Sequence, residues 1–284
     1  MASIRVGVAL GGGGARGISH IPVLEAIDEL GITPYAITGT SIGSLVGAGY
    51  ASGLSGAELK DYFMKTLGER NVVLNRLWQL RPRNFSELLS TPRLVQFNTE
   101  RILKVFAVPI REKTFEDLQI PFFVIATDFY NASEYVLSKG PLLPAVAGSI
   151  AIPFIFKPVQ LNNRILIDGG AVNPLPFDRL PEECNICVAV DVIGGPTPRL
   201  EKTMPSATEA AFGGLQILLQ TASQEKLKLR QPDLIVRPRV NNFQVIDFLK
   251  VKEILETTAP IKEVVKRQLG ALIELRLKNA SGPA

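Results

Sequence analysis

A serine between two glycines is the residue of this sequence best placed to act as a nucleophile. Residues 37–43 read Ile-Thr-Gly-Thr-Ser-Ile-Gly, a G-x-S-x-G pattern with Ser41 at its centre and Gly39 and Gly43 beside it. An apolar run precedes the pattern and a small-residue helical pattern follows it, which predicts a strand, a sharp turn and a helix. Because the backbone of such a turn is strained, larger flanking side chains would collide with the strand or the helix.

A second glycine-rich turn occurs earlier in the chain. Residues 11–17 read Gly-Gly-Gly-Gly-Ala-Arg-Gly, between a predicted strand over 4–10 and a predicted helix over 18–30. Gly12, Gly14 and Gly17 fit the G-x-G-x-x-G pattern of dinucleotide-binding folds. That interpretation needs an acidic residue at the end of the second strand, where this chain has Thr38–Ser41. A G-K-[ST] ending is also missing, so a nucleotide site is the weaker alternative.

The glycine turn could instead stabilise a developing negative charge. A glycine loop at a helix N-terminus exposes backbone N–H groups aimed at one point, and the helix dipole adds a positive potential there. Such an array suits the oxyanion of a tetrahedral acyl intermediate, and Arg16 would add a positive charge nearby. If the two strands are parallel neighbours, both turns lie at the same edge of the sheet.

Few groups in the sequence could accept the proton of Ser41. The only histidine, His20, falls in the first turns of the predicted helix after the glycine loop. A triad histidine normally lies on a late loop, after the acid, in folds of this type. We therefore favour a local hydrogen bond for His20 and expect the base to be a carboxylate.

Three aspartates end apolar, strand-like runs and could reach the same edge of an α/β sheet: Asp128, Asp168 and Asp191. Asp168 is favoured because two glycines follow it, which permits close approach by a neighbouring element. Asp128 and Asp191 are interpreted as caps of the turns that follow their strands. Among the three, Asp168 is therefore the favoured candidate for the base.

Three motifs together resemble the patatin-like phospholipase family. They are Gly11–Gly17, Gly39–Gly43 and the D-G-G at Asp168–Gly170, in the order and spacing of the family, and the segment Ala147–Pro153 also resembles it. The resemblance covers roughly residues 4–195 and is greatest to short bacterial, single-domain members. It implies one domain over 1–284, built as a three-layer α/β/α sandwich around a central, mostly parallel sheet.

The resemblance also implies a chemistry, namely a Ser–Asp dyad without histidine. Ser41 would be the nucleophile and Asp168 the proton acceptor, with an oxyanion group made by Gly12, Gly13, Gly14 and Arg16. The remaining motif glycines would be Gly17, Gly39, Gly43, Gly169 and Gly170. The implied activity is hydrolysis of fatty-acyl esters in phospholipids, lysophospholipids or acylglycerols, with no metal and no cofactor. The alternative is a non-catalytic regulatory or lipid-binding protein on the same scaffold.

Positive charge is concentrated in one segment. The formal net charge of the chain is +4, yet residues 65–113 carry ten Lys or Arg against four Glu. Within them, a proline-broken, cap-like insertion at about 68–97 mixes Trp78, Phe85 and Phe97 with arginines. That mixture suits an anionic lipid surface, and a solvated cap with salt bridges is the alternative. Nucleic acid is not expected as a partner, because no binding motif accompanies the charge.

The remaining features predict an ordinary globular protein. The chain is 46% hydrophobic and 20% charged, and no apolar run is long enough to span a membrane. The N-terminus shows no signal-peptide pattern, so we expect a cytoplasmic location with peripheral contact at a membrane as one alternative. Cys184 and Cys187 are interpreted as structural thiols. A helical region is expected at about 204–278, with helices over 206–229 and 251–277 around a short strand at 233–236.

Overall fold

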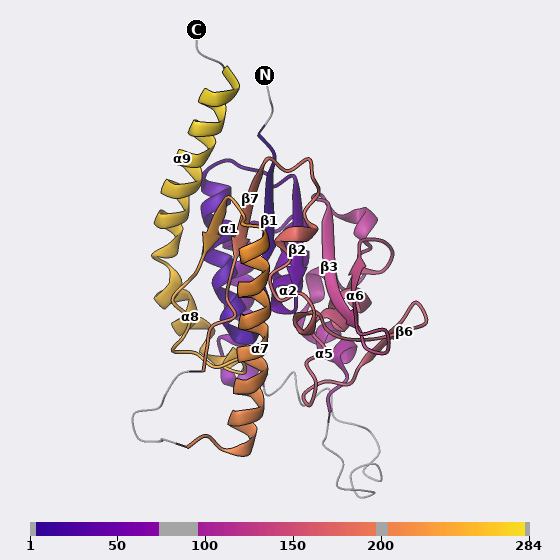
Figure 1. The fold of residues 1–284 in the computed structure, drawn as a ribbon. Helices are drawn as coiled ribbons and strands as arrows, with labels where there is room; N and C mark the ends of the chain where they lie inside the picture. Colours follow the sequence, from indigo (N-terminus) through magenta and orange to yellow (C-terminus); the bar gives the residue numbers. More distant parts are fainter. Residues whose placement is uncertain (1–3, 74–95, 197–203, 282–284) are drawn as a thin grey trace, which may run out of the picture.

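The computed structural model describes residues 4–73, 96–196 and 204–281. Residues 74–95, most of the predicted basic insertion, lie outside that description. The described strands form an eight-stranded sheet in which hydrogen-bonded neighbours follow the order β5-β6-β3-β2-β1-β7-β8, and β4 also pairs with β3 (Figure 1). In chain order the strands are β1 Val6–Leu10, β2 Ala36–Thr40, β3 Phe122–Asp128, β4 Ser133–Leu137, β5 Val159–Leu161, β6 Arg164–Asp168, β7 Ile186–Val190 and β8 Leu234–Val236.

The central strands are parallel and buried on both faces. β3, β2, β1, β7 and β8 run parallel to their neighbours, and every residue of β1, β2 and β7 is buried. Nearly continuous apolar runs are typical of strands covered on both faces, which is why these three read as apolar without alternation. β4, β5 and β6 pair antiparallel, so the sheet is mixed at one side.

Helices cover both faces of the sheet and make the three predicted layers (Figure 1). The larger core cluster packs helices and strands together on one face, while α7 covers the other with the segment 174–180. The α-helices of the described residues are α1 His20–Glu29, α2 Ile42–Ala51, α3 Gly56–Leu67, α5 Thr99–Phe106, α6 Leu142–Ser149, α7 Ala207–Leu229, α8 Val251–Thr258 and α9 Ile261–Ser281.

The C-terminal helices show where local signals decide the boundaries. α7 begins where predicted, because Ser206 and Glu209 form a capping box at its N-terminus. The prediction of one helix over 251–277 was wrong, since α8 ends at Thr258 and α9 begins at Ile261. Pro260 lies between them, and proline both lacks an N–H donor and clashes with the preceding turn. None of the described helices combines the length and apolar character needed to cross a membrane.

The sheet brings three chain segments to one place. Leu10 pairs with Gly39, so the glycine loop after β1 and the turn after β2 emerge at the same edge. On β3, Val124 pairs with both Gly39 and Leu137, and Ala126 pairs with both Tyr135 and Asp168. Because β4 therefore occupies one edge of β3, β2 and β6 must share the other. β2 and β6 therefore meet end to end along β3, and their carboxyl ends face each other at Thr40 and Asp168.

Candidate active site

Ser41 occupies the sharp turn between β2 and α2. Its backbone angles are φ 53° and ψ −126°, a conformation that residues other than glycine rarely adopt. The carbonyl of Ser41 accepts two hydrogen bonds from Ser44, one from its backbone N–H at 2.8 Å and one from the Ser44 hydroxyl at 2.6 Å. A Cβ on Gly39 would lie 2.7 Å from the Cα of Ser44, and one on Gly43 would lie 2.1 Å from the carbonyl oxygen of Leu10. The turn therefore requires glycine at both positions.

The side chain of Ser41 donates a hydrogen bond to Asp168. Its Oγ lies 2.6 Å from Asp168 Oδ2, and the backbone N–H of Gly170 donates to Asp168 Oδ1 at 2.7 Å. Both carboxylate oxygens are thus oriented, and Ser41 and Asp168 are 5% and 9% exposed. A Cβ on Gly169 would lie 2.1 Å from the carbonyl oxygen of Ile125, so this motif glycine allows β6 to end against β3.

Burial raises the pKa of Asp168 to about 6, against the lowering effect of hydrogen bonds from Ser41 and Gly170. A base with a pKa closer to neutrality accepts a hydroxyl proton more readily than an ordinary aspartate, yet it is still ionised at pH 7 to 8. The burial that the Ser41–Asp168 interpretation required is therefore present.

Ser149, at the end of α6, supports the turn from the other side. The backbone N–H of Ser41 donates to Ser149 Oγ at 2.9 Å, and that hydroxyl donates to the carbonyl of Ile125 at 2.6 Å. The strained turn is thereby tied to the edge of β3. Sequence reasoning noted the segment Ala147–Pro153 but did not single out Ser149, because a lone serine inside a helical pattern carries no signal of this contact.

The environment of His20 does not favour a role as the base. It lies fully buried at the start of α1, where its Nε2 donates to the carbonyl of Gly11 at 2.8 Å. Burial lowers the pKa of His20 to about 4, so the ring is neutral at pH 7. Its hydrogen bond supports the glycine loop from beneath, in agreement with the local role expected from the sequence.

The glycine loop lies directly against Ser41. A Cβ on Gly12 would approach the Cβ of Ser41 at 3.2 Å, and Gly14 has a φ of +59°, which favours glycine. The N–H groups of Gly11, Gly12 and Ala15 donate to the carbonyls of Val190, Pro174 and Val245 at 2.8–3.0 Å. Among the described residues, the N–H groups of Gly13 and Gly14 have no such acceptor. They are the loop donors that remain for a ligand, whereas that of Gly12 is already used.

The guanidinium of Arg16, predicted to be part of the oxyanion group, donates its hydrogen bonds to main-chain carbonyls. Its Nε donates to the carbonyl of Phe243 at 2.7 Å, and its Nη1 and Nη2 donate to those of Ile193 at 2.5 Å and Gly195 at 3.3 Å. The residue is 2% exposed. Its guanidinium therefore ties the glycine loop to the segments after β7 and β8, and its hydrogen-bond donors are directed to main-chain carbonyls. Gly17, the next residue, allows close packing on α2, since a Cβ there would lie 2.1 Å from Ile42.

Two cavities meet at Ser41 and Gly14. The larger has a volume of about 290 Å³ and an almost entirely apolar lining from α2, α3, α5 and the segments around them. The smaller, of about 70 Å³, also contains Asp168 and lies beneath α7. Described residues of the larger cavity include Leu45, Leu59, Phe63, Leu103, Phe106, Ile110, Ile150 and Phe156, and those of the smaller include Gly12, Gly13, Gly170, Phe212, Leu215, Gln216 and Leu219.

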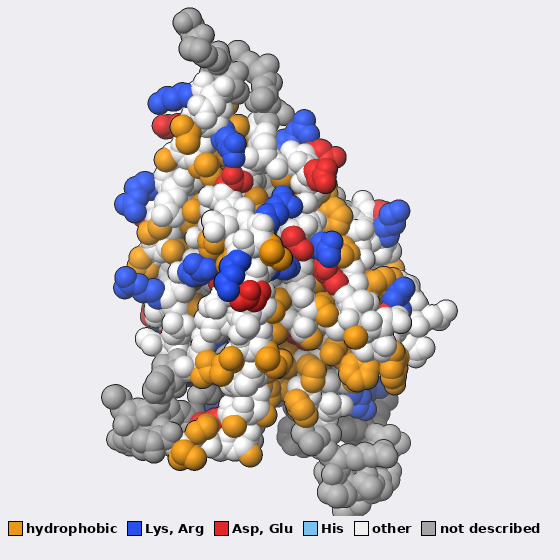
Figure 2. Space-filling view, viewed as in Figure 1, with side chains coloured by type: hydrophobic (Ala, Val, Ile, Leu, Met, Phe, Trp, Pro, Cys, Tyr) orange, Lys and Arg blue, Asp and Glu red, His pale blue; other side chains and the backbone are white. Residues whose placement is uncertain are grey.

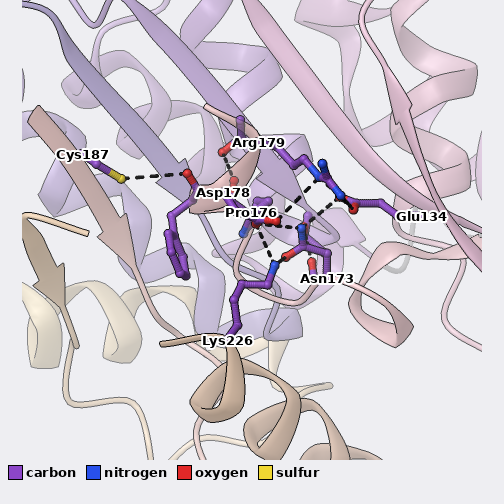
Figure 3. A network of polar contacts seen from close by, with 10 residues as sticks. Glu134, Asn173, Pro176, Asp178, Arg179, Cys187 and Lys226 are labelled. Carbon is purple, nitrogen blue, oxygen red and sulfur yellow. Dashed lines mark hydrogen bonds and ion pairs between the residues drawn. The ribbon is translucent and has the colours of Figure 1, made fainter. Parts of the chain in front are cut away.

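A polar network attaches α7 to the loop that follows Asp168 (Figure 3). Lys226 Nζ donates to Asp178 Oδ1 at 2.7 Å and also to Asn173 Oδ1. The amide of Asn173 donates to Glu134 at 2.9 Å and to Asp178 at 3.1 Å. Thr40, one residue before Ser41, donates to the carbonyl of Asn173 at 2.8 Å. The network therefore links α7 to the active-site turn, and no local sequence pattern indicates it.

The other candidates from the sequence have local roles. Asp128 accepts a hydrogen bond from Asn131 Nδ2 at 2.7 Å and pairs with Arg164. Asp191 accepts from the backbone of Ile193 at 3.2 Å, as a turn cap does. Cys184 and Cys187 are free thiols, as predicted, and burial raises the pKa of Cys187 to about 12. Within the part of the chain that is described, no cluster of His, Cys, Asp and Glu could hold a metal.

The chain is similar in sequence to known proteins. The chain is 31% identical over 209 residues to an uncharacterized NTE family protein of Mycobacterium tuberculosis, covering 72% of this chain and 54% of that protein. It is 28% identical to Lysophospholipase NTE1 of Candida glabrata, covering 93% of this chain and 16% of that protein. The chain thus spans about half the length of the mycobacterial relative and about a sixth of the yeast one.

Solved structures give weaker likenesses. VipD from Legionella pneumophila aligns with a TM-score of 0.49 and 12% identity, covering 93% of this chain and 67% of VipD. The ExoU–SpcU complex of Pseudomonas aeruginosa aligns with a TM-score of 0.37 and 19% identity, covering 95% of this chain and 60% of the matched one. The family model described as patatin-like phospholipase matches residues 8–181, which hold the glycine loop, Ser41 and Asp168. The chain therefore belongs to the patatin-like phospholipase family.

Proposed function

We propose that this protein is a serine esterase that hydrolyses fatty-acyl esters of lipids through a Ser41–Asp168 dyad. The observation that carries the proposal is the 2.6 Å hydrogen bond from Ser41 Oγ to a buried carboxylate, made where an apolar cavity meets the glycine loop. Membership of the patatin-like phospholipase family supports a lipid substrate. A phospholipid, a lysophospholipid or an acylglycerol would all present the required ester.

The proposed reaction has two steps. Asp168 accepts the hydroxyl proton while Ser41 Oγ attacks the ester carbonyl carbon, and the carbonyl electrons move onto oxygen. The N–H groups of Gly13 and Gly14 hold that oxyanion. When the carbonyl re-forms, the C–O bond to the alcohol breaks and the alcohol takes the proton from Asp168. Water, deprotonated by Asp168, then attacks the acyl-enzyme, and collapse of this second intermediate releases the fatty acid and returns the proton to Ser41.

The acyl chain is assigned to the larger cavity. That cavity opens at Ser41, is lined almost entirely by apolar side chains and has a volume of about 290 Å³. Burying methylene groups there is favourable by about 0.8 kcal/mol each. A substrate bound in this way would place its ester carbon between Ser41 and the free N–H groups of the loop.

A direct test combines active-site labelling with a substrate panel. A fluorophosphonate should label Ser41 covalently, and peptide mass mapping should locate the adduct on that residue. The protein should also release fatty acid from at least one of phosphatidylcholine, lysophosphatidylcholine and monoacylglycerol, whereas Ser41→Ala should not. A folded protein that is neither labelled nor active would favour the non-catalytic, lipid-binding alternative.

The rate should rise with pH through the pKa of Asp168. Because the carboxylate must be ionised to accept a proton, kcat/KM for a neutral ester should increase between pH 5 and pH 7 and level off above it. The apparent pKa should lie near 6, the value to which burial raises that of Asp168. Initial rates with a monoacylglycerol across pH 4.5–8.5 would measure it. A profile that is flat from pH 4.5 would contradict a base in this state.

Several exposed apolar side chains lie next to residues that line the two cavities. Each is a chain neighbour or a bridge partner of a cavity-lining residue. Hydrophobic side chains gather in the lower half of the face that Figure 2 shows. We define the apolar rim as Phe97, Phe154, Ile217, Leu218, Ile246 and Leu249. Exposed apolar side chains next to a lipid site suit contact with a membrane surface. The proposed peripheral contact thus involves the rim as well as the basic segment 65–113.

Replacing two rim residues should weaken binding to vesicles. Phe154 and Leu218 are 61% and 68% exposed, so Phe154→Ser with Leu218→Ser should leave the fold intact. Each side chain loses roughly 1 kcal/mol or more of burial in lipid, which predicts at least a tenfold weaker partition. Co-sedimentation with phosphatidylcholine–phosphatidylglycerol vesicles would measure this partition.

The matched control for this test is Leu229→Ser. Leu229 is 90% exposed on the same helix, but it lies three turns beyond Leu218, away from the cavities. The Leu229→Ser variant should bind vesicles as strongly as the wild type. Equal loss in the control and the double variant, or no loss in either, would argue against the rim as the lipid-facing surface.

A further inference from the structure

One face of α7 forms the roof of the smaller cavity. Phe212, Leu215, Gln216 and Leu219 line the cavity, and their spacing of three and four residues places them on one side of the helix. A Cβ on Gly170 would meet Leu219 at 3.5 Å, ordinary van der Waals contact. The helix therefore packs directly on the residue whose N–H holds Asp168.

Gln216 is the polar exception on this face. Its Nε2 atom is buried and has no hydrogen-bond partner among the described residues. A buried amide donor without an acceptor costs stability, and such groups in native proteins usually have a structural or functional explanation. An apolar side chain at this position would close the roof equally well. A ligand in the cavity that supplied an acceptor would satisfy this donor.

A lysine further along α7 holds the helix in place and so fixes the position of Gln216. Lys226, ten residues further on, is bound by Asp178 and Asn173 in the loop that follows Asp168 (Figure 3). Leu219 lies between the two and rests on Gly170. Because α7 is held at Leu219 and at Lys226, the amide of Gln216 is oriented before a ligand binds. This preorganisation reduces the entropic cost of binding.

The position of the cavity identifies the part of the ligand that it would receive. The two cavities share Ser41 and Gly14, so an ester carbon at Ser41 with its acyl chain in the larger cavity directs its alcohol into the smaller one. With a volume of about 70 Å³, the smaller cavity accommodates only a few water-sized groups. No Lys or Arg occurs among the described residues that line it, which favours a neutral acceptor over a phosphate.

We propose that the smaller cavity is the subsite for the alcohol part of the ester and that Gln216 Nε2 donates a hydrogen bond to a neutral glycerol oxygen there. This inference rests on the proposed esterase function and narrows its substrate class. The preferred substrates are glycerol esters that present a hydroxyl or ether oxygen next to the scissile bond. Gln216 acts by binding and orienting the leaving group, and it takes no part in proton transfer.

The test compares Gln216→Met with the wild type on three esters of one fatty acid: a monoacylglycerol, lysophosphatidylcholine and the ethyl ester, which has no second oxygen in its alcohol. Methionine keeps the length of the side chain and removes the donor. Relative to the ethyl ester, kcat/KM for both glycerol esters should fall about tenfold, as expected for one lost hydrogen bond. Gln220→Met, one turn further along α7 and outside the cavity lining, should keep the wild-type ratios.

The possible failures are distinguishable. An active wild type whose substrate ratios are unchanged in Gln216→Met would overturn the subsite and leave the esterase function standing. A loss confined to lysophosphatidylcholine would make the phosphate the partner of Gln216 and overturn the glycerol assignment. A wild type that hydrolyses none of the three esters faster than Ser41→Ala would overturn the esterase function, and the subsite with it.

Discussion

Asp168→Asn should lower kcat/KM for a lipid ester by about 10²–10⁴-fold, the usual contribution of a general base. Asparagine has the shape of aspartate, so its Oδ1 can still accept the hydrogen bond that Gly170 makes at 2.7 Å. Its amide group can remain next to Ser41 Oγ, which lies 2.6 Å from Asp168 Oδ2 in the native protein. What it cannot do is accept the serine proton. Initial rates with monoacylglycerol, measured against a Ser41→Ala background, would show the loss.

The same variant should be more stable than the wild type at neutral pH. Burial raises the pKa of Asp168 from 3.8 to about 6, so the folded protein favours the protonated form. That contribution to stability is fully present below the unfolded pKa and is lost as pH rises through the folded one. Asparagine does not titrate, so its advantage should grow between pH 4 and pH 6 and then stay constant. Its upper limit is about 3 kcal/mol, a Tm rise of several degrees.

A matched substitution of His20 separates the two bases that the sequence offered. His20→Gln keeps a side-chain N–H donor for the carbonyl of Gly11 and should retain most of the activity, since the native ring is neutral and buried. Activity lost in folded His20→Gln and retained in Asp168→Asn would refute the dyad. Circular dichroism and Tm would establish that both variants are folded before their rates are compared.

The parts of the site predicted from sequence are those with local physical signals. Gly39 and Gly43 mark the turn at Ser41, because no Cβ fits at either position. The D-G-G motif marks Asp168 for a similar reason: at Gly169, a Cβ would lie 2.1 Å from the carbonyl oxygen of Ile125. Apolar runs without alternation likewise mark β1, β2 and β7 as buried strands. Close approach of two backbone segments requires glycine, and full burial of a strand favours apolar residues. Both features can therefore be predicted from the sequence.

The parts that sequence reasoning missed depend on pairings between distant segments. The sequence favours Asp168 as the base, but it does not indicate that Asp168 reaches Ser41 from β6, which runs antiparallel to β3 and meets β2 end to end. Ser149 and Lys226 act through partners 108 and 48 positions away, respectively. Register and long-range contacts of this kind follow from the assembled sheet, and a serine or lysine within a helical pattern carries no trace of them.

Arg16→Lys should destabilise the protein by about 3 kcal/mol, since buried hydrogen bonds to a charged group are each worth about 1.5–3 kcal/mol. The guanidinium donates to carbonyls of Ile193, Gly195 and Phe243, a geometry that a lysine ammonium on a single stem cannot reproduce. The charge is kept, so the substitution changes only the geometry of the donors. Thermal unfolding followed by circular dichroism would measure the fall in Tm, which should amount to several degrees.

Arg237→Lys provides the matched control, because Arg237 is 58% exposed and pairs with Asp191 at 3.1 Å on the surface. Exposed pairs contribute little, so its Tm should stay at the wild-type value. If the guanidinium of Arg16 instead donated hydrogen bonds to the oxyanion, Arg16→Lys would keep its Tm and lose only rate, which would contradict the anchoring role. The anchoring role predicts that Arg16→Lys lowers the Tm. A rate loss should follow, because Gly13 and Gly14 rest against the carbonyls of Val192 and Val245, in segments that border the ones Arg16 holds.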